Sequence, residues 1–151
     1  MEQKEKLHEL AIITVNYNAY KVTQEFVASL GKQTDHAFRV FIIDLSTSTE
    51  EHEWPSWVSV FDGPNGGYSY GVNCGVREAQ KMGYEHFAII NNDTEVAVDL
   101  VKQVKIALTE HPHGLVGAKI YYHPGFEFHT VPKKQQGRYS GMQEAISIGF
   151  M

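Results

Sequence analysis

Residues 10–18 read LAIITVNYN, a run of six apolar or β-branched residues that ends in two asparagines around a tyrosine. The length and composition of this run favour a strand that is buried on both faces, as strands of parallel sheets are. Residues 22–32 follow with hydrophobic side chains at helical spacing, so a strand leading into a helix is predicted.

The same alternation continues along the chain. Further strands are predicted at residues 38–43, 57–61, 86–90 and 115–120, and further helices at residues 69–82 and 98–110. Apolar strands joined by helices predict an α/β fold of Rossmann-like type, with a mostly parallel central sheet flanked by helices. Ligands of such sheets bind at the carboxyl ends of the strands, so the residues that follow each strand are the first candidates for chemistry.

Composition limits the class of protein. The 151 residues suit about one domain, and 42% hydrophobic with 21% charged residues is ordinary for a globular protein. A net charge of −5 argues against a protein that coats nucleic-acid phosphates. The single cysteine, Cys74, cannot form an internal disulfide, and the amino terminus does not resemble a secretory signal, so we expect a cytoplasmic location.

The first two strands end in polar residues. The turn after the first strand lacks the G-x-G-x-x-G pattern of dinucleotide folds, and Tyr17 between Asn16 and Asn18 suits contact with a base or ribose. An ordinary strand-to-helix turn is the alternative, because asparagine is common in turns. Asp44 follows the second strand, where it could accept a hydrogen bond from a base or a ribose hydroxyl; the Ser/Thr run beyond it is equally typical of a cap or loop.

Residues 65–76 read NGGYSYGVNCGV, with Gly67, Gly71 and Gly75 at every fourth position. A glycine inside a helix costs about 1 kcal/mol relative to alanine, so three of them need a compensating gain. Tight packing of the helix on the sheet is one explanation. A sugar nucleotide bound near the helix amino terminus, where free amides favour anions, is the other, and the sequence leaves both open.

The fourth predicted strand runs directly into Asn91-Asn92-Asp93-Thr94. Amide and carboxylate oxygens are the ligands that Mg²⁺ and Mn²⁺ prefer. An Asx-type turn would need the same residues, but their position at the carboxyl end of a buried strand favours a cation site.

Taken together, these segments resemble the family 2 glycosyltransferases of GT-A fold, especially the rhamnosyltransferase-like members. The resemblance covers residues 10–121 and rests on an ordered series: IITVNYN (12–18), SLGKQT (29–34), FIIDLS (41–46), NGGYSYGVNCGV (65–76), AIINNDT (88–94) and VGAKI (116–120). It implies a nucleotide-sugar-binding α/β domain over residues 1–121, followed by an irregular tail over residues 122–151 that is a remnant of the acceptor-side region.

The resemblance also assigns roles to residues. Asn91 and Asp93 resemble the family's D-x-D motif in an N-x-D form and would bind the Mg²⁺ or Mn²⁺ that bridges the donor diphosphate. The residues implied in nucleotide or donor binding are Val15, Tyr17, Asn18, Asp44, Asn65, Gly67, Asn73 and Asn92. Leu45 and Asn91 depart from the family pattern, and the missing charge at Asn91 should weaken cation binding.

The implied reaction moves a sugar from a nucleotide-diphosphate donor to a hydroxyl of a saccharide or lipid-linked acceptor, with inversion. The implied pathway is polysaccharide biosynthesis, and a lipid-linked acceptor would bring the chain to a membrane surface. The general base is not identified; Glu127 and Glu144 in the tail are the nominated carboxylates. The short tail suggests a truncated architecture that exposes apolar surface, so self-association or a partner chain is expected.

Two other functions remain open at this stage. The first is a catalytically inactive nucleotide-sugar-binding remnant or interaction module that lacks the acceptor half. The second is a flavodoxin-like or receiver-like domain. Receiver domains need an acidic cluster after the first strand, and Asn16-Tyr17-Asn18 supplies none.

Overall fold

The structure, a computed structural model, describes residues 10–48, 51–112 and 114–117. Within them the chain forms strands and helices in an α/β order. The elements are β1 (Leu10–Asn16), α1 (Tyr20–Leu30), β2 (Phe38–Asp44), β3 (Val58–Asp62), α2 (Tyr68–Lys81), β4 (His86–Ile89) and α3 (Leu100–Glu110).

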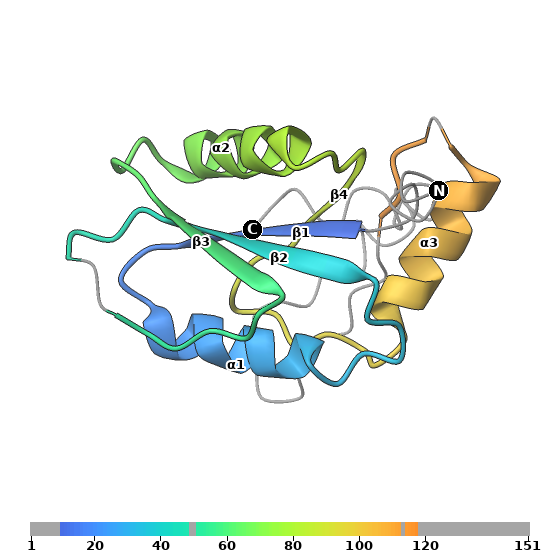
Figure 1. Ribbon diagram of the computed structural model, residues 1–151, viewed down its shortest axis with the longest axis horizontal. Helices are drawn as coiled ribbons and strands as arrows, with labels where there is room; N and C mark the ends of the chain where they lie inside the picture. Colours follow the sequence, from blue (N-terminus) through green and yellow to red (C-terminus); the bar gives the residue numbers. More distant parts are fainter. Residues whose placement is uncertain (1–9, 49–50, 113, 118–151) are drawn as a thin grey trace, which may run out of the picture. The chain divides into compact units, whose positions relative to one another are not determined.

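The four strands form one sheet in the order β3-β2-β1-β4, and every neighbouring pair is parallel (Figure 1). This confirms the predicted fold class. The register pairs Asn16 with Asp44, and Asp44 with Asp62, so the last residues of three strands lie in one row. All the strands therefore present their carboxyl ends at the same edge of the sheet, where the candidate residues were predicted.

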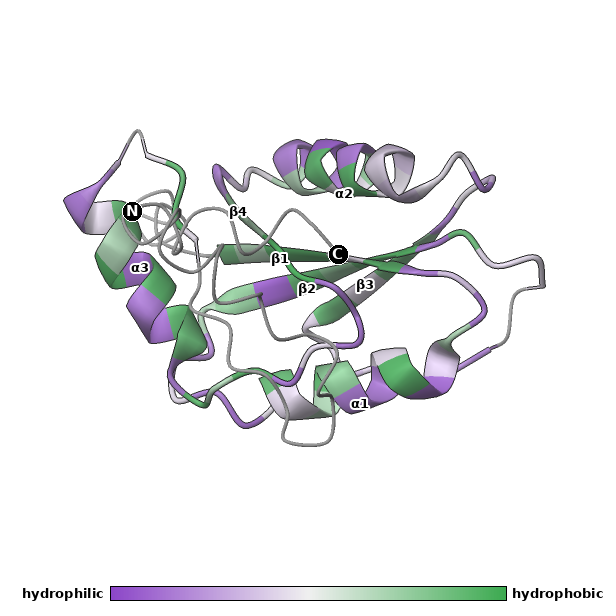
Figure 2. Cartoon of the chain, turned by 180° about the vertical axis from the view of Figure 1, so that it is seen from behind, coloured by the Kyte–Doolittle hydropathy of each residue, from purple (hydrophilic) through white to green (hydrophobic). Residues whose placement is uncertain are grey.

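Helices cover both faces of the sheet, with α2 on one side and α1 on the other (Figure 1). Ile13 of β1 and Phe41 of β2 are fully buried and pack with Ala79 of α2. Burial of each large apolar side chain contributes roughly 1.5–3 kcal/mol, which explains why the two central strands, β1 and β2, are mostly hydrophobic (Figure 2). The edge strands β3 and β4 are only partly buried.

The glycines of α2 serve helix-to-sheet packing. A Cβ on Gly71 would lie 2.8 Å from Val15, and a Cβ on Gly75 would lie 2.5 Å from Ile13. Both distances are too short for a side chain, so these two glycines let α2 pack directly on β1. Gly67 differs, because it precedes the helix at a φ of 88° with no atom within 4 Å of its Cβ position.

The helix starts differ from the predicted ones by one or two residues, and Gly83 follows the end of α2 as predicted, at a φ of 88°. The predicted strand at 115–120 differs: residues 115–117 have no strand structure, Leu115 is 89% exposed, and residues 118–120 lie outside the described residues. Within the described ranges no helix is long and apolar enough to cross a bilayer.

By its internal contacts the chain divides into residues 1–105 and 106–151, and α3 crosses that division. The predicted boundary after residue 121, with Glu127 and Glu144 beyond it, falls outside the described residues. The candidate site residues described next, from Val15 to Asp93, belong to the first unit.

Candidate functional site

Asn16, the last residue of β1, is fully buried with its amide directed at the end of β2. Its Nδ2 donates to Asp44 Oδ1 at 3.0 Å and to Ser46 Oγ at 3.1 Å. Because a buried amide must satisfy its donors, these bonds fix the orientation of the Asn16 side chain. The two strand ends are thereby joined through side chains as well as through the backbone.

Asp44 is 4% exposed, and its carboxylate collects four hydrogen bonds. Oδ1 accepts from Asn16 and from both the backbone N–H and the hydroxyl of Ser46, and Oδ2 accepts from the Tyr20 hydroxyl. Burial alone would raise the pKa of Asp44, but these hydrogen bonds outweigh it and hold the pKa below its ordinary value. The residues Asn16, Tyr20, Asp44 and Ser46, named the Asp44 cluster below, therefore keep a negative charge in place.

Asn18 ties the β1–α1 turn to the loop after β2. Its φ of 51° is in the left-handed region, which asparagine tolerates better than most residues. Its backbone N–H donates to Ser46 Oγ at 2.8 Å, and its Oδ1 accepts from the Thr47 N–H at 3.1 Å. Tyr17 lies between these bonded residues and is 49% exposed, so its ring is available at the surface.

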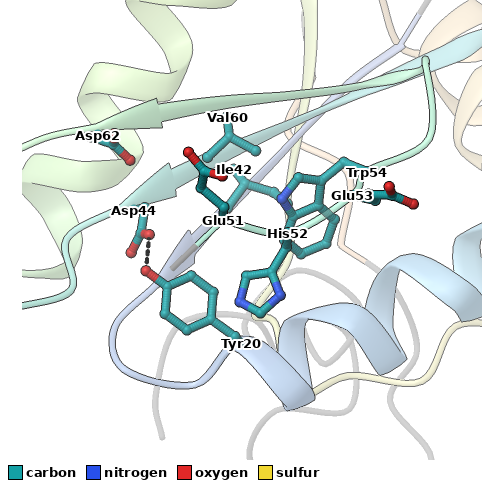
Figure 3. Close-up of a pocket in the computed structure, with 9 residues that line it drawn as sticks. All are labelled: Tyr20, Ile42, Asp44, Glu51, His52, Glu53, Trp54, Val60 and Asp62. Atoms are coloured by element: carbon teal, nitrogen blue, oxygen red, sulfur yellow. Dashed lines mark hydrogen bonds between the residues drawn. The ribbon is translucent and has the colours of Figure 1, made fainter. Parts of the chain in front are cut away.

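An open pocket of about 610 Å³, named the Asp44 pocket below, lies beside the Asp44 cluster (Figure 3). Its floor is made by Ile42 and Val60, with Asp44 and Asp62 next to them at the strand ends. Tyr20, His52 and Trp54 bring aromatic rings to the pocket, and Tyr20 and His52 lie 4.5 Å apart between ring centroids. The remaining lining residues are Glu51 and Glu53. The pocket is acidic, because its described lining includes aspartates and glutamates but no lysine or arginine.

Residues 91–94, called the Asn91 loop below, follow β4 and are largely exposed. Asn91 Oδ1 accepts a hydrogen bond of 2.8 Å from the hydroxyl of Tyr68, the first residue of α2. Burial, and then the negative charge of Asp93, raise the pKa of that hydroxyl. The Asp93 carboxylate therefore lies near the phenol that holds Asn91, and the two oxygen-bearing side chains face the start of α2.

The turn before α2 is closed by Asn65, whose Oδ1 accepts from the Gly67 N–H at 3.1 Å. This is the Asx-type turn that asparagine favours. Gly67, the residue before α2, has no side chain that could cap the first amides of the helix. The amino terminus of α2 consequently offers backbone donors and a positive dipole end next to the Asn91 loop.

The structure brings most of the predicted site residues to one edge of the sheet. The side chains of the other three predicted residues lie under α2, on α2 or in the interior. Val15 packs against Gly71 beneath α2, and Asn73 is exposed on α2 itself. The Asn92 side chain turns inward, and its Nδ2 donates to Thr23 Oγ1 of α1 at 2.9 Å.

Sequence reasoning missed several residues of this edge. Asp62 directly follows the predicted strand at 57–61, so the rule that selected Asp44 would also have selected it. Tyr20, His52 and Trp54 gave no such signal, because their place beside Asp44 depends on the tertiary fold.

The donor atoms of the Asn91 loop fit a divalent cation. Asn91 Oδ1 and the Asp93 carboxylate supply hard oxygen ligands that Mg²⁺ and Mn²⁺ accept. No cluster of three or more His, Cys, Asp or Glu side chains suited to a metal occurs within residues 10–48, 51–112 and 114–117. A cation held here would need further oxygens from a ligand or from water.

The parallel sheet flanked by helices forms an α/β domain whose candidate residues gather at the carboxyl edge of the strands. The profile of the family described as Glycosyl transferase family 2 matches residues 11–149, which is most of the chain. The chain belongs to this family. A search of curated proteins gave no match.

Solved structures share the fold. The crystal structure of residues 1–349 of TarS from S. aureus in complex with UDP-GlcNAc has a TM-score of 0.65 and 21% identity, covering 83% of this chain and 37% of that one. The complex of the same TarS segment with UDP has a TM-score of 0.64 and 21% identity, covering 83% and 38%. The chain therefore spans less than two fifths of the length of these two structures.

Proposed function

We propose that this chain binds a nucleotide-diphosphate sugar at the carboxyl edge of its sheet and serves as the donor-binding part of an inverting glycosyltransferase. The observation that carries the proposal is the convergence of the Asp44 cluster, the start of α2 and the Asn91 loop on one edge. Membership of the family and the UDP-GlcNAc and UDP complexes of TarS support it.

The base of the nucleotide belongs at the Asp44 pocket. The pocket offers apolar and aromatic surface for a ring together with a buried carboxylate, and its acidity would repel phosphates. Oδ1 of Asp44 already accepts three hydrogen bonds, whereas Oδ2 accepts one from Tyr20. One acceptor position remains, which suits a base with a single ring N–H, such as uracil or thymine, better than the paired N–H groups of guanine.

The diphosphate belongs at the start of α2 and the Asn91 loop. Uncapped amides at the amino terminus of α2 favour an anion. Asn91 and Asp93 would hold Mg²⁺ or Mn²⁺ there, and such a cation, when bound, neutralises the diphosphate as it leaves. Tyr17, Asn18, Asn65, Gly67 and Asn73 are the remaining proposed contacts to the nucleotide or sugar, and Val15 supports them from beneath.

In the proposed transfer, the acceptor hydroxyl oxygen forms a bond to the anomeric carbon while the bond from that carbon to the diphosphate oxygen breaks. The hydroxyl proton passes to a carboxylate base, and the configuration of the sugar inverts. The base is not identified, since Glu127 and Glu144 lie outside the described residues, and the proposed acceptor is a saccharide or lipid-linked hydroxyl. The competing proposal is a protein that binds the donor without turnover, either alone or with a partner chain.

Calorimetric titration with UDP, dTDP and GDP, each with and without Mn²⁺, tests donor binding. We expect UDP or dTDP to bind more tightly than GDP and Mn²⁺ to increase the affinity. Absence of binding by all three would refute the proposal. Incubation with the corresponding labelled sugar nucleotide then separates the two candidates, because release or transfer of sugar above background excludes the binding-only protein.

A further inference from the structure

A continuous series of hydrogen bonds lies beneath the two parts of the site. Asn92 Nδ2 donates to Thr23 Oγ1 at 2.9 Å, and Thr23 Oγ1 lies 2.8 Å from Asn16 Oδ1. Asn16 Nδ2 then donates to Asp44 Oδ1 at 3.0 Å. Thr23 and Asn16 are both completely buried, so this series connects the Asn91 loop to the Asp44 cluster through the interior.

Every bond of the series donates in the same direction, toward the negative charge of Asp44. The Thr23 hydroxyl has one hydrogen and lies closer to Asn16 Oδ1 than to the Ala19 carbonyl, which is 3.1 Å away. Reversing the Asn16 amide would place its oxygen against the Asp44 carboxylate. Bonds aligned in this way polarise and strengthen one another in a low-dielectric interior. The series thereby connects the side chain of Asn92 to the charge of Asp44.

We propose that Thr23 is a positioning residue that holds the Asn91 loop for cation binding by linking Asn92 to Asn16 and Asp44. Asn92 stands between Asn91 and Asp93, which are both exposed, while its own side chain is bonded inward to Thr23. The backbone anchors the loop at Ile90, whose N–H donates to the Ile13 carbonyl at 3.0 Å. The inference rests on the proposed function for the cation, and it assigns Asn92 to support of the loop instead of to contact with the nucleotide.

The test compares two buried hydroxyls of the same helix. Thr23→Val keeps the shape and removes the hydroxyl, and Thr23→Ser restores it. Ser29→Ala is the matched control, because Ser29 Oγ donates to the Phe26 carbonyl at 2.7 Å and has no bond to the site. In the full chain without nucleotide or metal, we expect Thr23→Val to lower the backbone ¹⁵N order parameters of residues 91–94 from about 0.85 to below about 0.6. Thr23→Ser and Ser29→Ala should match the wild type.

The second measurement is the gain in nucleotide affinity that Mn²⁺ provides, with UDP, dTDP or GDP, whichever the wild type binds most tightly. Loss of a residue that supports a metal ligand costs about 10–100-fold in metal affinity, so Thr23→Val should reduce this gain at least tenfold while Ser29→Ala keeps it. An unchanged Mn²⁺ gain, or unchanged order parameters, in Thr23→Val overturns the inference.

A wild type that binds none of the three nucleotides refutes the proposed function instead, and the order parameters still decide whether Thr23 holds the loop. If Thr23→Val does not fold, Asn92→Ala interrupts the same series at its partly exposed end. Both measurements apply to that variant with the same expected results.

Discussion

The Asp44 cluster and the Asn91 loop lie at the same edge of one sheet, yet they are built differently. Asp44 is 4% exposed and its carboxylate collects four hydrogen bonds. Asp93 is exposed, and Asn91 is held by Tyr68. Hydrogen bonds order both regions, but the first encloses its carboxylate, whereas the second leaves its oxygens exposed to a ligand.

The difference follows from what each region has to bind. A base is recognised by shape and by one or two hydrogen bonds, so a rigid carboxylate with a fixed charge gains affinity by avoiding reorganisation. A diphosphate with its cation brings charge and ligands of its own. Exposed oxygens that complete the coordination of the cation are sufficient there, and a buried carboxylate would only add a desolvation cost.

Replacing each aspartate by asparagine should produce the largest contrast. In Asp44→Asn one of the donors from Asn16, Tyr20 or Ser46 loses its acceptor, so we expect the free energy of unfolding to fall by about 2–3 kcal/mol. Asp93→Asn, at an exposed position, should change it by less than about 0.5 kcal/mol. Urea unfolding at pH 7 measures both values.

For the Mn²⁺ dependence of nucleotide binding, we expect the variant with the smaller loss of stability, Asp93→Asn, to show the larger effect. Asp93→Asn should remove most of the Mn²⁺ dependence of binding while the protein remains stable. Equal losses of stability in the two variants would mean that the contrast between an enclosed carboxylate and an exposed one is wrong.

The sequence predicted the four strands of the described sheet and its helices, because apolar runs and helical spacing are local patterns. It also predicted that Asp44 and Asp93 lie at one edge, since parallel strands end together. It left two explanations for the glycines, and the structure assigns Gly71 and Gly75 to packing. Tyr20 was not predicted, because its bond to Asp44 joins residues 24 positions apart and leaves no local pattern.

A negative charge added at residue 91 would make the Asn91 loop more like the Asp44 cluster. Asn91→Asp restores a carboxylate-x-carboxylate motif, and the added negative charge should raise the affinity for Mn²⁺ in the presence of nucleotide about tenfold, or ~1.4 kcal/mol. Calorimetry with and without Mn²⁺ measures the change. Asp62→Asn, which changes charge at the Asp44 pocket instead, should leave the Mn²⁺ dependence as it is in the wild type. No gain in Asn91→Asp would mean that the cation does not bind through residue 91.

Tyr20→Phe tests how the Asp44 cluster holds its charge. A carboxyl whose pKa is lowered by folding stabilises the protein above its unfolded pKa of about 3.9, and that contribution is lost as the pH falls through the folded value. Removing the Tyr20 donor should bring the folded pKa of Asp44 closer to the unfolded one. We expect a loss of about 1 kcal/mol at pH 7 and a smaller difference in unfolding free energy between pH 7 and pH 3. The same pH dependence as in the wild type would show that the Tyr20 hydroxyl does not stabilise the charge.

The smallest effect is expected outside both regions, at the ion pair of Asp35 and Lys105. Lys105 Nζ lies 2.9 Å from each carboxylate oxygen of Asp35, and this bond, followed by one from the Ala37 N–H, lowers the pKa of Asp35. The side chains are 29% and 20% exposed, so solvent screens the pair and Asp35→Asn should cost about 0.5 kcal/mol at low ionic strength. In 1 M NaCl the screening length falls to about 3 Å and the cost should shrink. Nucleotide affinity should stay at the wild-type value, with or without Mn²⁺. A change in affinity here would mean that the two regions of the site depend on the surrounding fold as a whole, and that the contrast between them cannot be assigned to their own hydrogen bonds.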